Sequence, residues 1–553
     1  MIKKSFILLL VLFTAAYAQN KNFKFHLQGE LKTFNKTNDE NPSSNSINDI
    51  LLVGDTIWLA TSNGLSKSMD NGLSWTNYYK TSDFGTESVS ALAYDTITHS
   101  IWASLAHSKD VSGSSLPEGA GLRFSTNNGT TWYTVPQPID ALTDTIETYG
   151  YHGKNMLHAL PVTVRVQNIT YDIAITRNVI WIASFAGGLR KNRIDSLIAT
   201  HGQAPWKRVV LPPDAKYNLS PADTTLSYSF CLSPVSGTYC SQDNYNYRVF
   251  SVTNAENGVL YVGTADGINK TSDALKSPSS NDSTAWVKFN HQKNPDYAIS
   301  GNFVVGLQFN EYDKTLWAVT WKANDNTELN GVSFTRDGGA TWQTTLRDHK
   351  AYNCAVNKNI VVFPSDDGAF RTTNLGDSWL VAGKITDSKT KVTLQTNVFY
   401  AAAFSGNGNQ LWLGSSEGLA VQSGNAPTWT NDWKLYIASQ KLSGGSDAHA
   451  FPNPFSPKTD ICKIKYSTGG NSEQVTIRIF SFSMKYIKTV IQNAQRGNPI
   501  GVINTTATDG VNGVVDFWDG RDDAGNIVPN GVYFYRIDIG SKDPVFGKIL
   551  VLE

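Results

Sequence analysis

The sequence predicts an all-β protein, a seven-bladed β-propeller followed by a smaller strand-rich domain. Three observations predict this fold. The chain of 553 residues contains 44 Gly, 23 Tyr and 15 Trp but is only 17% charged, a composition that favours β-rich globular proteins. A strand-like unit with Asn-Gly or Asp-Gly turns recurs over residues 45–439. From residue 451 the pattern changes to a short set of alternating strands with a Pro-rich entry.

The first 18 residues are typical of a secretory signal peptide. Lys3 and Lys4 precede an apolar run over residues 6–13, and small residues end at Ala18. Such a run is too short to span a membrane, and no later segment approaches 18 uninterrupted apolar residues. We therefore expect cleavage after Ala18, no transmembrane span, and a protein that is secreted or held at a bacterial cell surface.

Charge and cysteine content narrow the function classes. The formal net charge is zero, so the electrostatic footprint that nucleic-acid binding requires is absent. Four cysteines are too few for a disulfide scaffold. Cys231 and Cys240 bracket a short loop and could form one bridge, whereas Cys354 and Cys462 lie in apolar runs and are expected to be buried thiols. No cofactor motif and no metal-ligand spacing is found.

The repeat is marked by the string SMDNGLSW at 68–75, which returns in looser form at 125–132, 335–342 and 372–379. A strand-like run that carries an aromatic residue precedes each of these strings. The same kind of run recurs in positions without a full string, for example at 179–189 and 410–419, which gives seven occurrences along the chain. The period is about 56 residues with four short strands per unit, which is the signature of a β-propeller.

These strings resemble the Asp-box (BNR-type) repeats of sialidases, xyloglucan-degrading glycosidases, sortilin-type receptors and photosystem assembly factors. The resemblance implies that each string forms the turn between the third and fourth strands of a blade. It assigns a structural role to Asp70, Gly72, Trp75, Asn127, Trp132, Asp337, Trp342, Asn374 and Trp379. Because those families have unrelated functions, it implies a fold and no activity.

The end of the chain resembles the flagellar-hook-capping-protein-type Ig-like module, which is often a type IX secretion sorting signal. The match is carried by 453–455, 518–522 and 531–535. It implies an Ig-like sandwich that engages outer-membrane secretion or attachment machinery. The expected domains are a signal peptide (1–18), the propeller (19–440), a Gly/Ser linker (441–450) and the Ig-like domain (451–553).

Few carboxylates are placed where a glycosidase would need its catalytic acid and base. Asp266, Asp367 and Glu417 occupy equivalent turns between second and third strands and are weak catalytic candidates, because Asx-Gly turns are ordinary hairpin chemistry. The G-x-S-x-G match at 414–418 occupies the same turn rather than a strand-to-helix elbow. The acidic stretch 519–525 lacks the Gly and Glu of a calcium loop, so we expect no metal.

Long insertions point to a binding face. The segments 106–121, 136–160, 211–247 and 321–331 belong to the face opposite the Asp boxes, and long loops are usually functional or disordered. Their aromatic residues and one strand-end tryptophan suit stacking on sugars or gripping a protein segment. The expected binding residues are Tyr149, Tyr151, His152, Tyr217, Tyr228, Tyr245 and Trp321.

Three functions fit the sequence. We favour non-catalytic binding of an extracellular polysaccharide or protein over an enzyme. The alternatives are a glycoside hydrolase of sialidase-like or xyloglucanase-like fold and a surface adhesion or assembly scaffold. An enzyme would place two carboxylates about 5–10 Å apart in an open cleft, whereas a scaffold would present a flat surface.

Overall fold

The computed structural model of the chain describes residues 41–552, except 225, 227–229, 232–243, 277–281, 293–297, 324, 389–392, 395, 424–428, 430–431, 439–447, 469–470 and 498–513. The described residues form two compact units. Unit 1 takes residues 41–383 and 396–431, and unit 2 takes residues 384–395 and 432–552. The signal peptide and most of the linker lie outside the described residues, so the domain boundaries expected from the sequence stay predictions.

Unit 1 is built from meanders 1 to 7, in which consecutive strands pair antiparallel; meanders 1 to 6 have four strands each, and meander 7 has three within this unit. The strands of meanders 1 to 3 are β1 (Ile47–Val53), β2 (Thr56–Thr61), β3 (Gly64–Ser68), β4 (Thr76–Tyr78); β5 (Ser88–Asp95), β6 (Ser100–Val111), β7 (Ser114–Ser125), β8 (Tyr133–Val135); and β11 (Thr170–Thr176), β12 (Val179–Ser184), β13 (Gly188–Arg193), β14 (Lys207–Arg208). Those of meanders 4 and 5 are β17 (Val249–Asn254), β18 (Leu260–Thr264), β19 (Gly267–Thr271), β20 (Trp286–Phe289); and β21 (Phe303–Asn310), β22 (Thr315–Trp321), β23 (Gly331–Thr335), β24 (Gln343–Thr345). Those of meanders 6 and 7 are β25 (Ala355–Asn357), β26 (Ile360–Ser365), β27 (Gly368–Thr372), β28 (Leu380–Val381); and β29 (Phe399–Phe404), β30 (Gln410–Ser415), β31 (Leu419–Ser423). The next strand along the chain, β32 (Trp433–Tyr436), belongs to unit 2.

The second strands of most meanders are almost entirely buried. In β12, with the sequence VIWIAS, every residue is buried, and β22 is buried throughout as well. A short continuous apolar run, rather than strict alternation, is what a strand covered on both faces requires. The aromatic residues that mark the repeat, such as Trp102 and Trp181, are therefore core residues.

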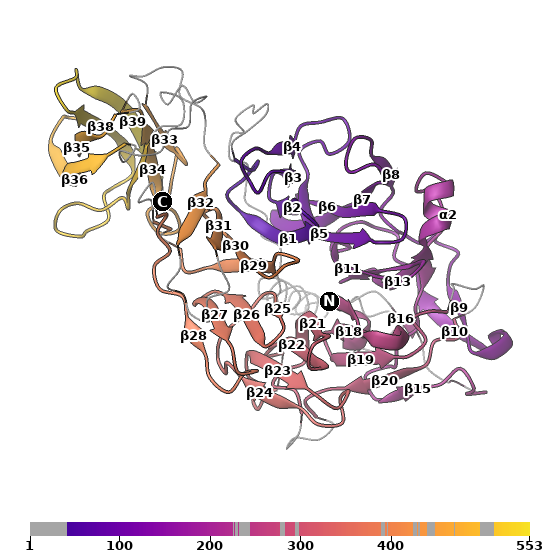
Figure 1. Ribbon diagram of the computed structural model, residues 1–553. Helices are drawn as coiled ribbons and strands as arrows, with labels where there is room; N and C mark the ends of the chain where they lie inside the picture. Colours follow the sequence, from indigo (N-terminus) through magenta and orange to yellow (C-terminus); the bar gives the residue numbers. More distant parts are fainter. Residues whose placement is uncertain are drawn as a thin grey trace, which may run out of the picture. The chain divides into compact units, whose positions relative to one another are not determined.

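The first strands of the meanders form a ring. Each first strand contacts the first strand of the next meander, from β1 through β5, β11, β17, β21 and β25 to β29, and β29 contacts β1 (Figure 1). Side chains bridge neighbouring members of the ring: Ser90 donates to the Thr170 carbonyl at 2.7 Å and Ser251 to the Val304 carbonyl at 2.9 Å. Radial repetition of small sheets around one axis is the architecture of a β-propeller.

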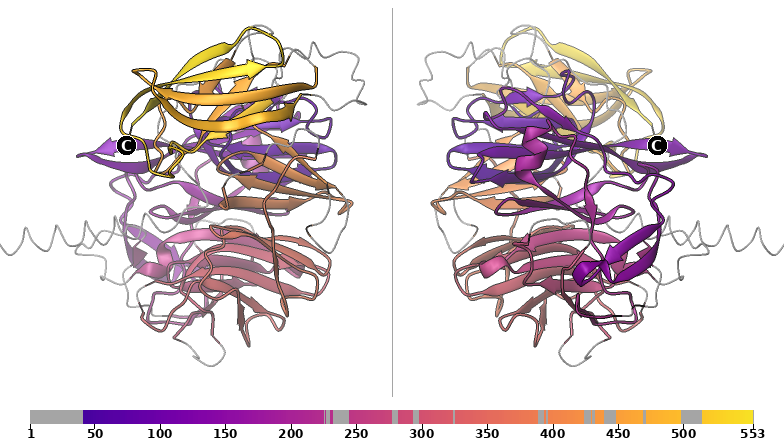
Figure 2. Two further views of the ribbon diagram at one scale, coloured as in Figure 1. Left: turned by 90° about the vertical axis from the view of Figure 1, so that its left-hand side faces the viewer. Right: turned by 90° about the vertical axis from the view of Figure 1, so that its right-hand side faces the viewer.

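Insertions interrupt the regular meanders. Strands β6 and β7 have 12 residues each and form a long hairpin that reaches beyond its neighbours (Figure 2). The connection from meander 2 to meander 3 carries β9 (Ile146–Tyr149), the 3-10 turn η1 (Tyr151–Gly153) and β10 (Asn155–Leu160). Helix α2 (Ile194–Ala199) lies within meander 3. Before and within meander 4 lie β15 (Asn218–Leu219), β16 (Phe230–Cys231), η2 (Tyr245–Tyr247) and η3 (Glu256–Gly258).

Unit 2 contains two antiparallel sheets around one core. Their orders are β33-β34-β37 and β36-β35-β38-β39. The strands are β33 (Ala448–Phe451), β34 (Cys462–Tyr466), β35 (Glu473–Ser481), β36 (Tyr486–Arg496), β37 (Val514–Trp518), β38 (Gly531–Ile539) and β39 (Val545–Val551). Ile464 and Trp518 from the first sheet share a buried cluster with Ile477 and Tyr535 from the second, so the sheets pack as a sandwich.

Candidate ligand-binding face

The antiparallel topology gives every meander of unit 1 two ends. The turn between its third and fourth strands lies at one end, which we call the box face. The turn between its second and third strands and the connection to the next meander lie at the other end, which we call the loop face. The insertions 136–160, 211–247 and 321–331 connect strand ends on the loop face, whereas 106–121, expected to be a loop, is the outer part of the β6–β7 hairpin at that face.

The first Asp-box string closes its own turn on the box face. The Ser68 hydroxyl donates to the Asp70 carboxylate at 2.8 Å and accepts the N–H of Gly72 at 2.8 Å. The same carboxylate oxygen, Oδ1, also accepts the Ser74 N–H at 2.9 Å, and Oδ2 accepts the Ser74 hydroxyl at 2.6 Å. Asp70 therefore serves the turn and leaves no carboxylate oxygen dedicated to a ligand.

The other strings repeat this geometry. Asp337 accepts the Thr341 N–H at 2.9 Å and the Thr341 hydroxyl at 2.6 Å. Where Asn replaces Asp, the amide of Asn127 donates to the Thr131 hydroxyl at 2.8 Å, and its oxygen still accepts the Thr131 N–H at 2.9 Å. Asn374 does the same with Ser378. Asn is thus a conformational equivalent of Asp that reverses one hydrogen bond.

The box residues also join neighbouring meanders. A Cβ at Gly129 would lie 2.5 Å from the Tyr78 hydroxyl of the preceding meander, and a Cβ at Gly339 would lie 2.6 Å from the Phe289 ring. Both glycines have positive φ, at 81° and 103°. Trp132 packs edge-on against Tyr78 with ring centroids 5.4 Å apart. These contacts agree with a structural role for the strings.

Hydrogen bonds within the strings lower the pKa of the aspartates Asp70 and Asp337. Burial would raise the pKa of Asp337, but the opposing hydrogen bonds from Thr341 and Thr335 dominate and lower it to about 2. Burial would likewise raise the pKa of Asp70, but hydrogen bonds from Ser74 and Ser68 together outweigh it and lower the pKa. Both carboxylates are therefore charged over the whole neutral and mildly acidic range.

A buried charge cluster lies on the loop face of meander 4. Asp266, a weak catalytic candidate from the sequence, is ion-paired with Lys288, whose side chain is fully buried. The Lys288 ammonium also donates to the Asp214 carbonyl at 2.6 Å and stands 5.5 Å from the Tyr217 ring centroid. The remaining oxygen of Asp266 accepts the Asn290 amide at 3.0 Å. Asp266 is thus fully engaged within the protein.

A second carboxylate in this cluster, that of Asp214, was not predicted from the sequence. Its two oxygens accept the N–H groups of Tyr245 and Asn246, both at 2.9 Å, so it joins the two stems of the 211–247 insertion. Burial and the neighbouring charge of Asp266 raise the pKa of Asp214 to about 6. No sequence signal marks it, because only the fold brings it beside Asp266 and Lys288.

The other two candidate carboxylates have separate surroundings. Asp367 is 57% exposed and lies 3.0 Å from His349. The N–H of Glu417 donates to the Ser415 hydroxyl at 3.1 Å, and that hydroxyl donates to the Gly418 carbonyl at 2.8 Å. The match at 414–418 is therefore a hydroxyl-capped hairpin turn between β30 and β31, and its serines follow turn chemistry rather than an elbow.

Two of the expected binding aromatics are core residues. Tyr149 is fully buried and donates its hydroxyl to the Thr284 carbonyl at 2.8 Å. Trp321 is 2% exposed, and its indole N–H donates to the Ala351 carbonyl at 2.8 Å. This corrects the expectation that they contact a ligand. Their polar ends are satisfied by backbone, which lets large aromatic residues pack at the base of the insertions.

The remaining expected binding residues are placed differently. Tyr151 is 49% exposed, and His152 is exposed beside it with φ at 60°. Tyr217 and Tyr245 are half-buried, each with a cation over its ring. Tyr228 lies outside the described residues. The described part of the loop face thus retains Tyr151, His152, Tyr217 and Tyr245 as accessible candidates.

The structure describes the side chains of only two of the four cysteines. Cys240 lies outside the described residues, as does the Cys231 side chain, so their bridge stays a prediction. Cys354 and Cys462 are buried free thiols, as expected. Burial raises the pKa of both thiols, so neither is a ready nucleophile.

A second buried ion network fastens the 136–160 insertion. Arg190 pairs with Asp140 at 2.8 Å, and Arg208 pairs with Glu147 at 2.9 Å. Lys207 adds a second cation to Glu147 at 2.6 Å. The side chains of Arg190, Asp140, Arg208 and Glu147 are each at most 7% exposed. Apart from Arg190 Nη2, which has no hydrogen-bond partner among the described residues, these groups are paired with one another and position the insertion.

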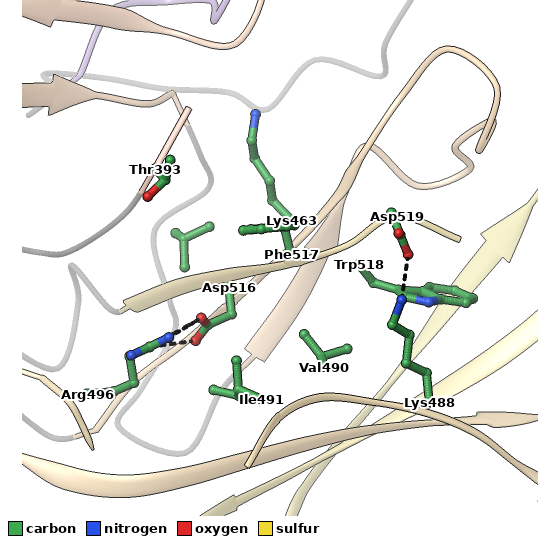
Figure 3. Close-up of a pocket in the computed structure, with 11 residues that line it drawn as sticks. Thr393, Lys463, Lys488, Val490, Ile491, Arg496, Asp516, Phe517, Trp518 and Asp519 are labelled. Carbon is green, nitrogen blue, oxygen red and sulfur yellow. Dashed lines mark hydrogen bonds and ion pairs between the residues drawn. The ribbon is translucent and has the colours of Figure 1, made fainter. Parts of the chain in front are cut away.

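Unit 2 has a groove of its own. A cavity of about 420 Å³ is lined by eleven residues, from Thr393 and β34, β36 and β37, with the following Asp519 (Figure 3). The charged groups in it point to one another: Arg496 contacts Asp516 at 2.8 Å, and Lys488 contacts Asp519 at 3.2 Å (Figure 3). Asp516 also accepts the Tyr466 hydroxyl at 2.6 Å. The pairing favours a structural role for these charges.

The described residues contain no group of three or more His, Cys, Asp or Glu side chains that could hold a metal ion. None of their helices is long and apolar enough to cross a membrane.

No protein-family model and no curated protein matches the sequence. Among solved structures, the chain is similar to PorZ, described as an essential bacterial surface component of the type IX secretion system of Porphyromonas gingivalis, with 12% identity, 92% of this chain and 75% of that chain covered, and a TM-score of 0.27. An ancestral GH74 enzyme is similar at 14% identity over 91% of this chain and 62% of its own, with a TM-score of 0.47. YCF48 from Cyanidioschyzon merolae is similar at 14% identity over 69% and 97%, with a TM-score of 0.39. Similarities this low carry no conclusion about activity.

Proposed function

We propose that the chain is a secreted or cell-surface protein whose seven meanders are the blades of a seven-bladed propeller, and that its loop face binds an extracellular polysaccharide or protein without catalysis. Unit 2 is proposed to be an Ig-like domain that engages outer-membrane secretion or attachment machinery. The Asp-box strings are proposed to be structural, which leaves the loop face for the ligand.

The engagement of the loop-face carboxylates carries this proposal. Asp266 is committed to Lys288 and Asn290, and Asp214 to two backbone N–H groups. A glycosidase needs one carboxyl that gives up a proton and another that is open to a water or the sugar. Tyr151 on the same face, in contrast, is 49% exposed.

One observation favours the alternative of a glycoside hydrolase. The raised pKa of Asp214, about 6, is the property of a general acid, and a second carboxylate, Asp266, is its neighbour. In this alternative Asp214 would protonate the leaving group and Asp266 would act as base or nucleophile.

The test is binding of the full mature chain to a glycan array, with a parallel assay for release of reducing sugar from the bound glycans. The proposal expects the chain to be retained on glycans without release of sugar. Asp266→Asn and Asp214→Asn should reduce glycan binding only to the extent that they unfold the protein. Release of sugar that either substitution abolishes would establish the hydrolase instead. Retention of no glycan and no extracellular protein would refute loop-face binding.

A further inference from the structure

Arg248 has an unusual setting on the loop face. It directly precedes β17, and its guanidinium stands between two aromatic rings, 4.6 Å from the Tyr245 centroid and 5.4 Å from the Phe185 centroid. Phe185 belongs to the turn after β12 in the preceding meander. The guanidinium is therefore held in place by stacking at a junction between meanders.

The hydrogen-bonding capacity of Arg248 is unused within the described residues. Its Nε is buried without a hydrogen-bond partner, and its side chain makes no hydrogen bond or ion pair with a described residue. Other buried arginines in unit 1 do find acceptors: Arg190 donates to Asp140, Arg208 to Glu147. Arg248 as a whole is half-buried, and a guanidinium whose Nε is buried without an acceptor among the described residues is costly, so an anion bound there is a natural complement.

The carboxylate that acts electrostatically on Arg248 is already engaged by the backbone. Asp214 influences Arg248 electrostatically, but both of its oxygens accept backbone N–H groups, as described above. In meander 6, Lys350 occupies the position that Arg248 has in meander 4, and its charge has an acidic partner. The carbonyl of Lys350 accepts the Asp366 N–H as the carbonyl of Arg248 accepts the Ala265 N–H, and the Asp366 carboxylate interacts with the Lys350 charge.

We propose, building on the proposed function, that Arg248 binds a carboxylate of the ligand and that the ligand is a polysaccharide containing uronic acid. The planar guanidinium suits a two-point contact with a carboxylate. The half-buried rings of Tyr217 and Tyr245 suit stacking on sugar rings. An acidic protein fits less well, because no large apolar side chain is exposed among the described residues of 211–219 and 244–248.

The experiment measures binding of the full mature chain to immobilised polygalacturonate by biolayer interferometry at fixed salt. Carboxyl-reduced polygalacturonate, neutral xyloglucan and poly-L-glutamate are the comparison probes. Arg248→Gln removes the charge, and Arg248→Lys keeps the charge but loses the planar fork. Arg336→Gln is the matched control, because Arg336 also stacks on a ring, 4.9 Å from the Phe334 centroid, but on the box face.

Binding of polygalacturonate is expected to weaken roughly tenfold or more in Arg248→Gln, and by a smaller factor in Arg248→Lys, with Arg336→Gln unchanged. Carboxyl-reduced polymer should bind no better than xyloglucan. The inference is overturned if Arg248→Gln binds polygalacturonate normally while its thermal unfolding matches the parent, or if the reduced polymer binds as well. Equal or tighter binding of poly-L-glutamate would assign the site to an acidic protein instead. Retention of other ligands on the array, unaffected by Arg248→Gln, would remove this inference but leave loop-face binding standing.

Discussion

Aspartate residues occur on both the box face and the loop face, but their hydrogen-bond partners differ between the two faces. On the box face, Asp70 and its counterparts bind hydroxyl and amide groups inside one eight-residue string, so each turn is complete in itself. On the loop face, Asp214 and Asp266 are satisfied by groups far away in sequence, such as Lys288 and the N–H of Tyr245. The box face is thus locally determined and repeated, and the loop face is assembled by tertiary contacts.

This contrast explains why the strings recur and the insertions do not. A turn that satisfies its own donors and acceptors can be copied into any meander without a change elsewhere. A buried ion pair tolerates no loss of one partner, because the other is left charged and unpaired. Variation in the loop face must therefore be coordinated, which suits a surface that differs among proteins with the same scaffold.

The largest expected difference between the two faces concerns buried charge. Lys288→Met should lower the free energy of unfolding by about 3–5 kcal/mol, since it leaves Asp266 without its cation. Lys67→Met is the control on the box face, where Lys67 donates only to the Asn128 carbonyl, and it should cost about 1 kcal/mol or less. Urea unfolding of both variants measures this, and equal losses would contradict the distinction.

A smaller effect is expected from close packing between meanders. Gly129→Ala should destabilise the protein by about 2–3 kcal/mol, since its Cβ would meet the Tyr78 hydroxyl and the Trp58 ring. Gly113→Ala has the same φ of 81° but open space around the Cβ, so it isolates the backbone cost of about 1 kcal/mol. Thermal unfolding by circular dichroism should rank the variants in that order, and a reversed order would place the strain in the backbone alone.

A single box should matter less. Asp70→Ala should cost about 1 kcal/mol through the lost hydrogen bonds to the turn, with ligand binding unchanged. Asp70→Asn should stay within about 0.5 kcal/mol, because Asn127 and Asn374 already occupy this position. Chemical denaturation checks the stability and the array checks the binding. A binding defect in Asp70→Ala at unchanged fold would move function to the box face.

The pH dependence should have opposite signs on the two faces. Asp214 keeps its proton to about pH 6 when folded and to about 3.9 when unfolded. The folded state therefore binds more protons between these values, and this contribution to stability falls as pH rises through that window. Asp337, with a folded pKa of about 2, contributes stability above its unfolded pKa that is lost as pH falls toward 2. Urea unfolding from pH 2.5 to 7 in Asp214→Asn and Asp337→Asn should remove the respective slopes, and unaltered slopes would contradict these assignments.

Much of unit 1 was readable from sequence because its signals are local. The recurring aromatic strand and the Asp/Asn-Gly-Trp strings needed no knowledge of distant contacts, and the turn geometry of Asp70 and Asn127 followed from side-chain chemistry. The binding residues were harder. Tyr149 and Trp321 looked like surface aromatics on long insertions, yet both are core residues, because burial depends on what the insertion folds against.

Sequence therefore sufficed for the strand pattern, the repeat and the box turns, since each is decided by residues within a few positions of one another. The pairing of Asp214 with Asp266 and Lys288, and the placing of Arg248 between Tyr245 and Phe185, were decided only by the tertiary structure. Apart from Tyr245, which lies close to Arg248 in the chain, those groups are separated by tens of residues, and a residue's charge does not reveal which distant partner will satisfy it. The same separation explains why an arginine in an ordinary strand-entry segment became the most informative residue of the loop face.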